Sequence, residues 1–289
     1  MNRKGIILAG GTGSRLFPIT LGISKQLLPI YNKPMIYYPI TTLIELGIKD
    51  ILLITNQIYL NNYKNILKDG KHLGLNISYK IQNKPNGLAE ALILAEDFLN
   101  GSPSVLILGD NLFYLNEKNI FKKSKKNTGA QILLYKVSNP EDYGVAKIKK
   151  NKIVDIVEKP KKFVSNYAVT GIYFYDKFAP KYAKKLTPSK RGELEITDLN
   201  KIYLKKNLLN YYILEEGSAW LDTGSHESLS YASDFVRTLE KRQGILVGSL
   251  ELASIKNKLV NKDKMIKYIK NFSSDYFKSL KKQVEEGDF

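Results

Sequence analysis

The chain has 289 residues, of which 43% are hydrophobic, enough to bury the core of one large domain or of a domain with an appendage. It contains no cysteine, which excludes disulfides and thiolate metal sites, and its two histidines do not favour a multi-histidine zinc site. The net charge is +17, but lysine is spread along the chain rather than clustered, so we expect no specific nucleic-acid partner.

No segment of the sequence resembles a leader or a membrane anchor. The first apolar run, residues 6–9, is short and is followed at once by glycines, unlike a signal peptide. No stretch approaches the roughly 18 apolar residues of a membrane span. We therefore expect a cytoplasmic protein without a membrane partner.

Short apolar runs alternate with helical stretches in the first part of the chain. The patterns predict strands and helices in turn, over residues 5–9, 34–46, 51–55, 58–67, 77–81, 87–99 and 105–108. This alternation predicts an α/β fold with a doubly wound, mixed, mostly parallel sheet and helices on both of its faces.

The rest of the chain is richer in strands and ends in helices. Strands are predicted over 131–137, 144–148, 153–158 and 168–175, and helices over 196–204 and 227–241. Residues 249–289 are rich in lysine, and apolar residues recur there at steps of three or four, typical of one helix face: Met265, Ile269, Phe272, Tyr276 and Leu280. We expect a main domain over 1–245 and a helical C-terminal appendage over 246–289.

A glycine-rich loop directly follows the first predicted strand. Residues 8–16 read Leu-Ala-Gly-Gly-Thr-Gly-Ser-Arg-Leu, so three glycines precede a hydroxyl and Arg15. Glycines let the backbone approach a ligand closely, successive N–H groups can then converge on an anion, and an arginine adds a bidentate donor for phosphate. Neither the Rossmann fingerprint nor a Walker A loop fits the spacing. A tight turn without a ligand is the alternative.

Two further charged residues favour a phosphate site. Lys25 follows Arg15 closely enough for both cations to reach one phosphate cluster, although a lone lysine is usually solvated. Asp110 directly follows an apolar strand, where open α/β sheets place their ligands, although an aspartate after glycine commonly caps a loop. Together the two residues favour binding of phosphate and metal.

These segments resemble the sugar nucleotidyltransferase family, whose signature is a Gly-Gly-x-Gly-x-Arg loop followed by Lys-x-Leu-x-Pro. The match covers residues 3 to about 245 and includes further ordered blocks, at residues 82–90, 108–111, 143–145, 158–160, 165–171, 191–198 and 219–224. The blocks around Gln82 and at 165–171 are most similar to the branch of the family that uses dTTP and glucose 1-phosphate and releases pyrophosphate and dTDP-glucose. We do not extend the resemblance into residues 249–289.

The resemblance implies a Rossmann-like nucleotidyltransferase core, with a nucleotide-binding half near 1–115, a sugar-binding half near 116–245, and a homotetramer. The nucleotide positions that it implies are Leu8, Gly10, Gly11, Thr12, Gly13, Ser14, Arg15, Lys25, Gln26, Gln82, Pro85, Gly87 and Asp110. The sugar-phosphate positions are Asn111, Tyr143, Gly144, Glu158, Lys159, Val169 and Tyr173. Asp110 and Asp222 match the Mg²⁺ ligands, and the catalytic set is Arg15, Lys25, Asp110, Lys159 and Asp222.

Several alternatives stay open on the residues alone. Glu158 and Lys159 also read as a solvated ion pair, Trp220 as core packing, and Arg191 with Glu195 as a charge pattern at a helix start. A relative that uses UTP, CTP or ATP is the main alternative enzyme, since one methyl group separates thymine from uracil. A basic nucleic-acid-binding or regulatory protein on a degenerate fold is the alternative of a different class.

Overall fold

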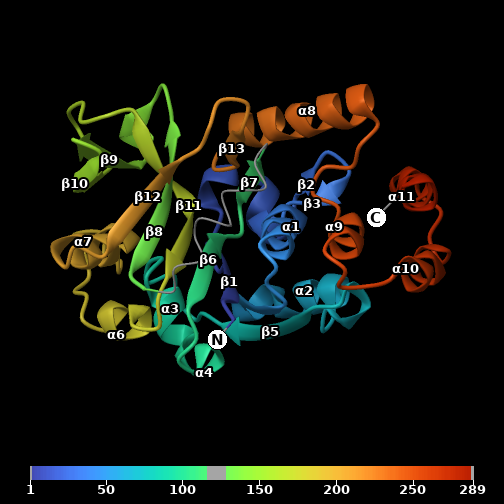
Figure 1. Ribbon diagram of the computed structural model, residues 1–289, viewed down its shortest axis with the longest axis horizontal. Helices are drawn as coiled ribbons and strands as arrows, with labels where there is room; N and C mark the ends of the chain where they lie inside the picture. The colour runs from blue at the N-terminus through green and yellow to red at the C-terminus, as the bar shows by residue number, and fades with distance from the viewer. Residues whose placement is uncertain (1, 116–127, 288–289) are drawn as a thin grey trace.

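The computed structural model describes residues 2–115 and 128–287. Within them a nine-stranded mixed sheet forms the centre, in the order β10-β9-β11-β6-β1-β4-β5, with β8 added next to β11 and β12 next to β8 (Figure 1). The bounds of these strands are β1 Lys4–Ala9, β4 Asp50–Thr55, β5 Asn76–Ile81, β6 Ser104–Leu108, β8 Ala130–Lys136, β9 Gly144–Lys149, β10 Lys152–Glu158, β11 Tyr167–Tyr175 and β12 Leu209–Ile213.

The first half of the sheet is parallel and the second half is mainly antiparallel. β1 lies between β4 and β6 with parallel pairing on both sides, and Ile7 is opposite Leu53 and Ile107. β11 runs antiparallel to β6, β8 and β9, so it joins the two halves. The predicted doubly wound, mixed α/β sheet is confirmed.

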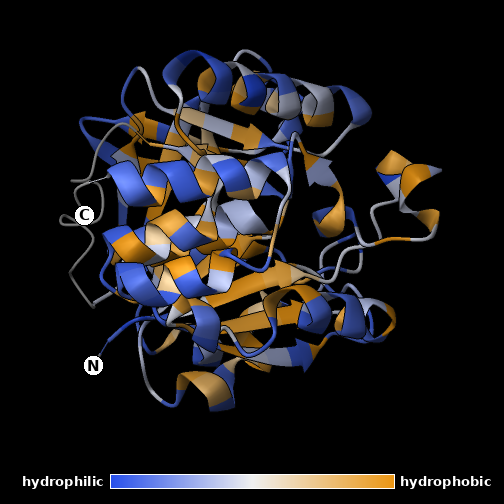
Figure 2. Cartoon of the chain, turned by 90° about the vertical axis from the view of Figure 1, so that its right-hand side faces the viewer, coloured by the Kyte–Doolittle hydropathy of each residue, from blue (hydrophilic) through white to orange (hydrophobic). Residues whose placement is uncertain are grey.

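Helices cover both faces of the sheet, so its strands are apolar on both sides. In β1, Ile7 and Ala9 face one hydrophobic core while Ile6 and Leu8 face the other, as expected for a strand buried on both faces. The first core includes α1 Tyr37–Glu45, α2 Leu60–Leu67 and α9 Leu250–Lys256. The second includes α3 Glu90–Leu94, α4 Glu96–Leu99, α6 Ala179–Ala183 and α7 Ile196–Lys205. Figure 2 shows the apolar strands in the interior of the protein, surrounded by helices that carry both hydrophilic and hydrophobic residues.

A third core lies beside the sheet and supports the site. The short strands β2 Pro29–Ile30 and β3 Lys33–Pro34 pair there, and α8 His226–Gln243 packs against them. A separate antiparallel pair, β7 Asn111–Tyr114 with β13 Ala219–Asp222, continues from the end of β6. The predicted helix start at residue 34 is wrong, because Pro34 belongs to β3 and the helix begins at Tyr37.

The helical C-terminal appendage is confirmed, but its residues do not form one continuous helix face. After α9 come α10 Lys262–Ile269 and α11 Asp275–Glu286, with Phe272 between them and 44% exposed. The side-chain amide of Asn271 donates to the Tyr268 carbonyl. This bond replaces the backbone pattern of a helix, and α10 ends there. Met265, Ile269 and Leu280 join the first core, so the appendage packs on the main body.

Some elements escaped the sequence patterns. β7, α6 and β12 were not predicted, and the single helix predicted over 87–99 is two short helices, α3 and α4. The boundary between the two halves, near residue 116, lies outside the described residues. The division at residue 245 stays a prediction. Among the described residues no helix is both long and apolar enough to cross a membrane.

Candidate active site

The glycine loop lies at the carboxyl end of β1 and forms one wall of a small pocket. Gly13 has a φ of +66°, which glycine adopts without strain, and its carbonyl accepts a 2.8 Å hydrogen bond from the Thr20 hydroxyl. A short turn, Ser14–Leu16, follows, and buried Leu16 anchors it in the third core. Arg15 is thereby carried into the pocket, whose volume is about 200 Å³.

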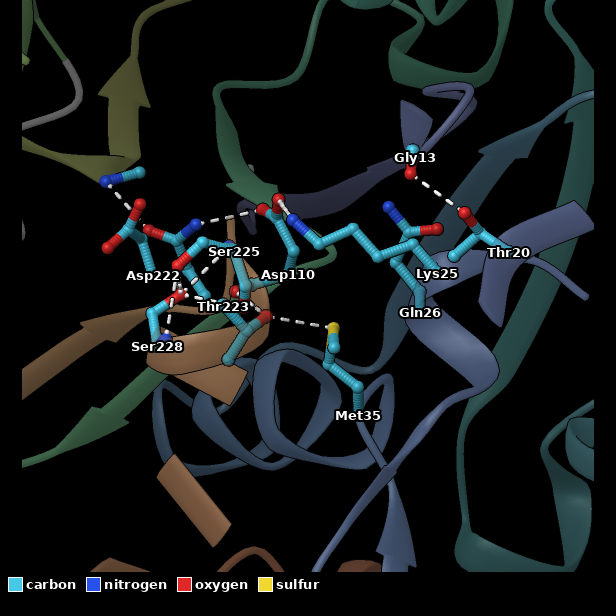
Figure 3. A network of polar contacts seen from close by, with 12 residues as sticks. Gly13, Thr20, Lys25, Gln26, Met35, Asp110, Asp222, Thr223, Ser225 and Ser228 are labelled. Carbon is cyan, nitrogen blue, oxygen red and sulfur yellow. Dashed lines mark hydrogen bonds and ion pairs between the residues drawn. The ribbon is translucent and has the colours of Figure 1, made fainter. Parts of the chain in front are cut away.

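Lys25 lies in the same pocket and already has an anionic partner. Its ammonium donates to the Asp110 carboxylate at 2.6 Å (Figure 3), and its side chain is only 6% exposed. A solvated surface lysine is therefore the wrong reading. Burial disfavours the Asp110 charge, but Lys25 and the Asn111 amide stabilise it more strongly, so the pKa of Asp110 is lowered.

Asp110 and Asp222, far apart in the sequence, meet through the β7–β13 pair. Asn111 at the start of β7 is opposite Asp222 at the end of β13. The Thr223 hydroxyl and N–H both donate to the Asp110 carbonyl, at 2.9 and 3.2 Å, which ties the two segments together (Figure 3). The two aspartates are therefore neighbours at the carboxyl edge of the sheet.

Asp222 is held in a less favourable environment than Asp110. Burial raises the pKa of the Asp222 carboxyl, and the neighbouring Asp110 charge adds to this, whereas the Tyr143 hydroxyl, which donates at 3.0 Å, acts against it. A Cβ placed on Gly224 would lie 3.2 Å from the Asp222 carboxylate and 3.3 Å from the Arg15 guanidinium. Carboxylate and guanidinium therefore converge on the space above Gly224.

The carboxylates present fit a hard divalent cation that takes part of its coordination from the substrate. No group of three or more His, Cys, Asp or Glu side chains able to hold a metal exists in the described part of the chain. The pair Asp110 and Asp222 suits Mg²⁺, which commonly binds through one or two carboxylates and completes its shell with phosphates and waters. A site built for zinc or calcium would need more protein ligands.

A larger pocket of about 410 Å³ adjoins the glycine loop, in the size range of small-molecule sites. Of the predicted site residues it is lined by Leu8, Gly11, Arg15, Gln26, Gln82, Pro85, Gly87, Asp110, Asn111, Tyr143, Gly144, Glu158, Lys159, Val169, Tyr173 and Asp222. Thr12, Gly13, Ser14 and Lys25 line the smaller pocket, and only Gly10 of the predicted set lines neither. Gly11, Arg15, Gln26 and Asp110 line both pockets, so the two are continuous.

Gln82 and Gly87 line the larger pocket, and each is packed closely against another part of the chain. Gln82 directly follows β5, and Gly10 lies against its side chain, because a Cβ on Gly10 would come within 2.3 Å of Gln82 Oε1. Gly87 has a φ of +109°, and a Cβ there would meet the Leu194 backbone at 2.5 Å. Gly10 and Gly87 are thus required by close packing.

Glu158 and Lys159 also line the larger pocket, and they do not form the ion pair of the alternative reading. Glu158 accepts a 2.6 Å hydrogen bond from the Thr197 hydroxyl and lies 3.7 Å from Arg191. Lys159 has a φ of +42°, a conformation uncommon outside glycine that is enriched at functional sites. Gly144 approaches Glu158 so closely that a Cβ would lie 3.0 Å from its carboxylate.

Asn111 connects several segments that line the pocket. Its side-chain oxygen accepts hydrogen bonds from the Trp220 indole at 2.6 Å and from the Gly171 N–H at 3.2 Å, and its amide donates to Asp110 at 2.9 Å. Trp220 is therefore part of the pocket wall as well as of the core.

Several pocket residues were outside the predicted set. Arg191 forms a 2.8 Å ion pair with Glu195, and both line the pocket together with Thr197, Glu193 and Asp142. The signal for four of them, all but Asp142, was the ordered block at 191–198. The backbone explains why this block reaches the site: Leu194 exchanges hydrogen bonds with Asn86 and Ala89, which closes the pocket from above Gly87.

The sequence of this chain matches known proteins over most of its length. Residues 4–238 match the family model described as nucleotidyl transferase. A glucose-1-phosphate thymidylyltransferase from Xanthomonas campestris pv. campestris (strain B100) is 51% identical over 248 residues, which cover 85% of this chain and 84% of the relative. One from Neisseria meningitidis (strain Z2491) is 47% identical over 265 residues, covering 91% and 92%.

Two solved structures have folds similar to that of this chain. A protein from Bacillus anthracis, described as a glucose-1-phosphate thymidylyltransferase in complex with a sucrose, has a TM-score of 0.77 and 45% identity, covering 82% of this chain and 96% of that one. A UDP-glucose pyrophosphorylase complexed with UDP-glucose has a TM-score of 0.73 and 27% identity, covering 84% of this chain and all of that one.

Proposed function

Since the chain belongs to the nucleotidyl transferase family, we propose that it transfers the thymidylyl group of dTTP to glucose 1-phosphate, giving dTDP-glucose and pyrophosphate. The observation that carries this proposal is the meeting of Arg15, Lys25, Asp110 and Asp222 beside an open glycine loop. The match to thymidylyltransferases over most of their length supports the choice of substrates.

The reaction needs charge neutralisation and positioning more than covalent help. Glucose 1-phosphate is already an anion, and its attack on the α-phosphorus in line with departing pyrophosphate brings two polyanions together. The loop N–H groups and Arg15 would hold the triphosphate, while Lys25 would approach the α-phosphate. Lys25 is held by Asp110, so its ammonium is in position before the substrate arrives.

We further propose that Asp110 and Asp222 hold Mg²⁺. Bound there, the ion would offset the negative charge of the substrate phosphates. The Tyr143 hydroxyl fixes the Asp222 carboxylate, and Asn111 fixes that of Asp110, so both are oriented by the protein.

Two groups of residues in the larger pocket would bind different parts of the substrates. Leu8, Gln82, Pro85 and Gly87 would take the base, and Lys159 would take the phosphate of the sugar. Glu158, with Tyr143, Gly144, Val169 and Tyr173, would surround the sugar, whose hydroxyls suit a carboxylate acceptor.

The test is release of pyrophosphate from dTTP plus glucose 1-phosphate, with Mg²⁺ and with a chelator. We expect dTDP-glucose as the product, dependence on the metal, and preference for dTTP over ATP and GTP. Turnover of purine triphosphates equal to that of dTTP would contradict the base assignment. Activity with UTP would not, because one methyl group in an apolar pocket is worth only about 1–3 kcal/mol.

The homotetramer and the cytoplasmic location remain predictions. Light scattering of the purified protein measures the assembly directly. Transfer of a uridylyl group from UTP stays the second candidate function, supported by the structural similarity to UDP-glucose pyrophosphorylase.

A further inference from the structure

Glu90, at the start of α3, holds the Gln82 side chain in one orientation. The Gln82 amide nitrogen donates to Glu90 Oε2 at 2.6 Å, and the Asn86 amide donates to Glu90 Oε1 at 2.8 Å. A carboxylate can only accept hydrogen bonds, so it is the NH₂ group of Gln82 that must face it. The reversed amide would place two acceptors against each other.

The orientation leaves the Gln82 oxygen available where the base would lie. The side chain is only 4% exposed and lines the larger pocket, and its oxygen lies against Gly10. Among the described residues no donor reaches this oxygen, and it is not one of their fully enclosed unpaired polar atoms. The pocket therefore presents a fixed acceptor, next to the amide nitrogen as a donor.

A fixed acceptor beside a donor distinguishes the pyrimidines. Thymine and uracil carry an N3–H donor between two carbonyl acceptors, so the Gln82 oxygen can accept from N3 while its nitrogen donates to a carbonyl. Cytosine, placed in the same way, offers an unprotonated N3 that would meet the Gln82 oxygen as a second acceptor. To bind cytosine, the amide would have to turn over and present its oxygen to Glu90.

We propose that Glu90 is a positioning residue that sets base specificity: by fixing the Gln82 amide, it selects thymine and uracil nucleotides against cytosine nucleotides. This inference rests on the proposed function, because it requires the base to lie at Gln82. Glu90 is not among the lining residues of either pocket, so it acts through Gln82.

The experiment compares kcat/KM for dTTP and dCTP, each with glucose 1-phosphate, in the full chain. In Glu90→Gln the new amide can donate as well as accept, so Gln82 can turn over. We expect the dTTP to dCTP ratio of kcat/KM to fall by about 10- to 100-fold, the factor equivalent to one hydrogen bond to a charged group. Glu90→Met, which keeps the length but cannot hold the amide, should lower the ratio in the same direction.

Glu96→Gln is the matched control, because Glu96 lies on the next helix and pairs with Lys184 instead of a pocket residue. It should leave the ratio unchanged, and thermal melting should show all three variants folded. An unchanged ratio in folded Glu90→Gln and Glu90→Met, or an equal loss with both nucleotides, would overturn the inference. A wild-type chain that uses neither nucleotide would instead refute the proposed function.

Discussion

Replacing Asp110 and Asp222 by asparagine, singly and together, tests whether they serve one metal ion. Each substitution removes a charge at nearly constant shape. By comparison with other lost electrostatic groups we expect each to lower kcat by about 10²–10³-fold, which is about 3–4 kcal/mol. If both hold the same ion, the second loss adds little. The double variant should then resemble the worse single variant, with a coupling free energy of about 3 kcal/mol.

The structure also predicts that the two variants differ in stability. Asp110→Asn leaves the Lys25 ammonium without its 2.6 Å partner. Breaking a buried ion pair costs about 3–5 kcal/mol, and because Asp110 retains 25% exposure we expect the lower end of that range. Burial and the Asp110 charge both oppose ionisation of Asp222 and raise its pKa, so its neutralisation should not destabilise the fold.

The assay is pyrophosphate release over a range of Mg²⁺ concentrations, combined with urea unfolding of each variant. Asp142→Asn is the matched control, because Asp142 lines the same pocket but pairs with Asn139. It should keep activity within a few fold. Additive losses in the double variant would refute a shared ion, and equal stability of the two single variants would refute the structural role given to the Lys25–Asp110 pair.

Three further outcomes can be measured directly. Arg15→Ala should lower kcat by about 10²–10³-fold with little change in glucose 1-phosphate binding, since Arg15 would offset charge on departing pyrophosphate; turnover within a few fold of wild type would refute this. Burial raises the pKa of the Glu251 carboxyl above its ordinary 4.5. As the pH rises from 4.5 past this raised pKa, ionisation of Glu251 lowers the free energy of unfolding. In urea unfolding, Glu251→Gln should therefore be more stable than wild type at pH 8 but not at pH 4. Any DNA binding measured by fluorescence anisotropy should be weak and fall steeply with salt, and a sequence-selective complex at physiological salt would contradict the reading of the +17 charge.

The parallel core of the fold was predictable because its strands are buried on both faces. Residues 5–9, 51–55 and 105–108 are short apolar runs, and each is a strand in the structure. β12 was missed because its sequence, Leu-Asn-Tyr-Tyr-Ile, is only partly buried and lies a few residues after a helix. The split between α10 and α11 was missed because apolar spacing at three and four residues continues across Phe272 although the helix does not.

Part of the site could be predicted from single segments of the sequence, whereas the rest depends on contacts that only the folded chain makes. The glycine loop, Arg15 and Asp110 each follow a strand end, so a single segment indicates their position. Arg191 and Glu195 look like an ordinary pair at a helix start, and only the hydrogen bonds of Leu194 to residues 86 and 89 bring them over the pocket. Glu90 ends the ordered block at 82–90, but the block does not reveal its proposed role, because that role depends on the Gln82 amide that it faces.

The central position of β11 has a consequence for building hybrid enzymes. β11 pairs with β8 along one side and with β6 and β9 on the other, so Ile172 is bonded into the strand that leads to Asp110 while Val169 lines the larger pocket. An exchange of sugar specificity with a relative, made by swapping everything after residue 128, would therefore replace five strands of the shared sheet, β8 to β12. A graft limited to residues 140–165, the β9–β10 hairpin and its flanking turns, would carry Tyr143, Glu158 and Lys159 while leaving the β6–β11 seam native. Such a graft should fold where the larger swap fails, because it crosses the sheet only at its edge.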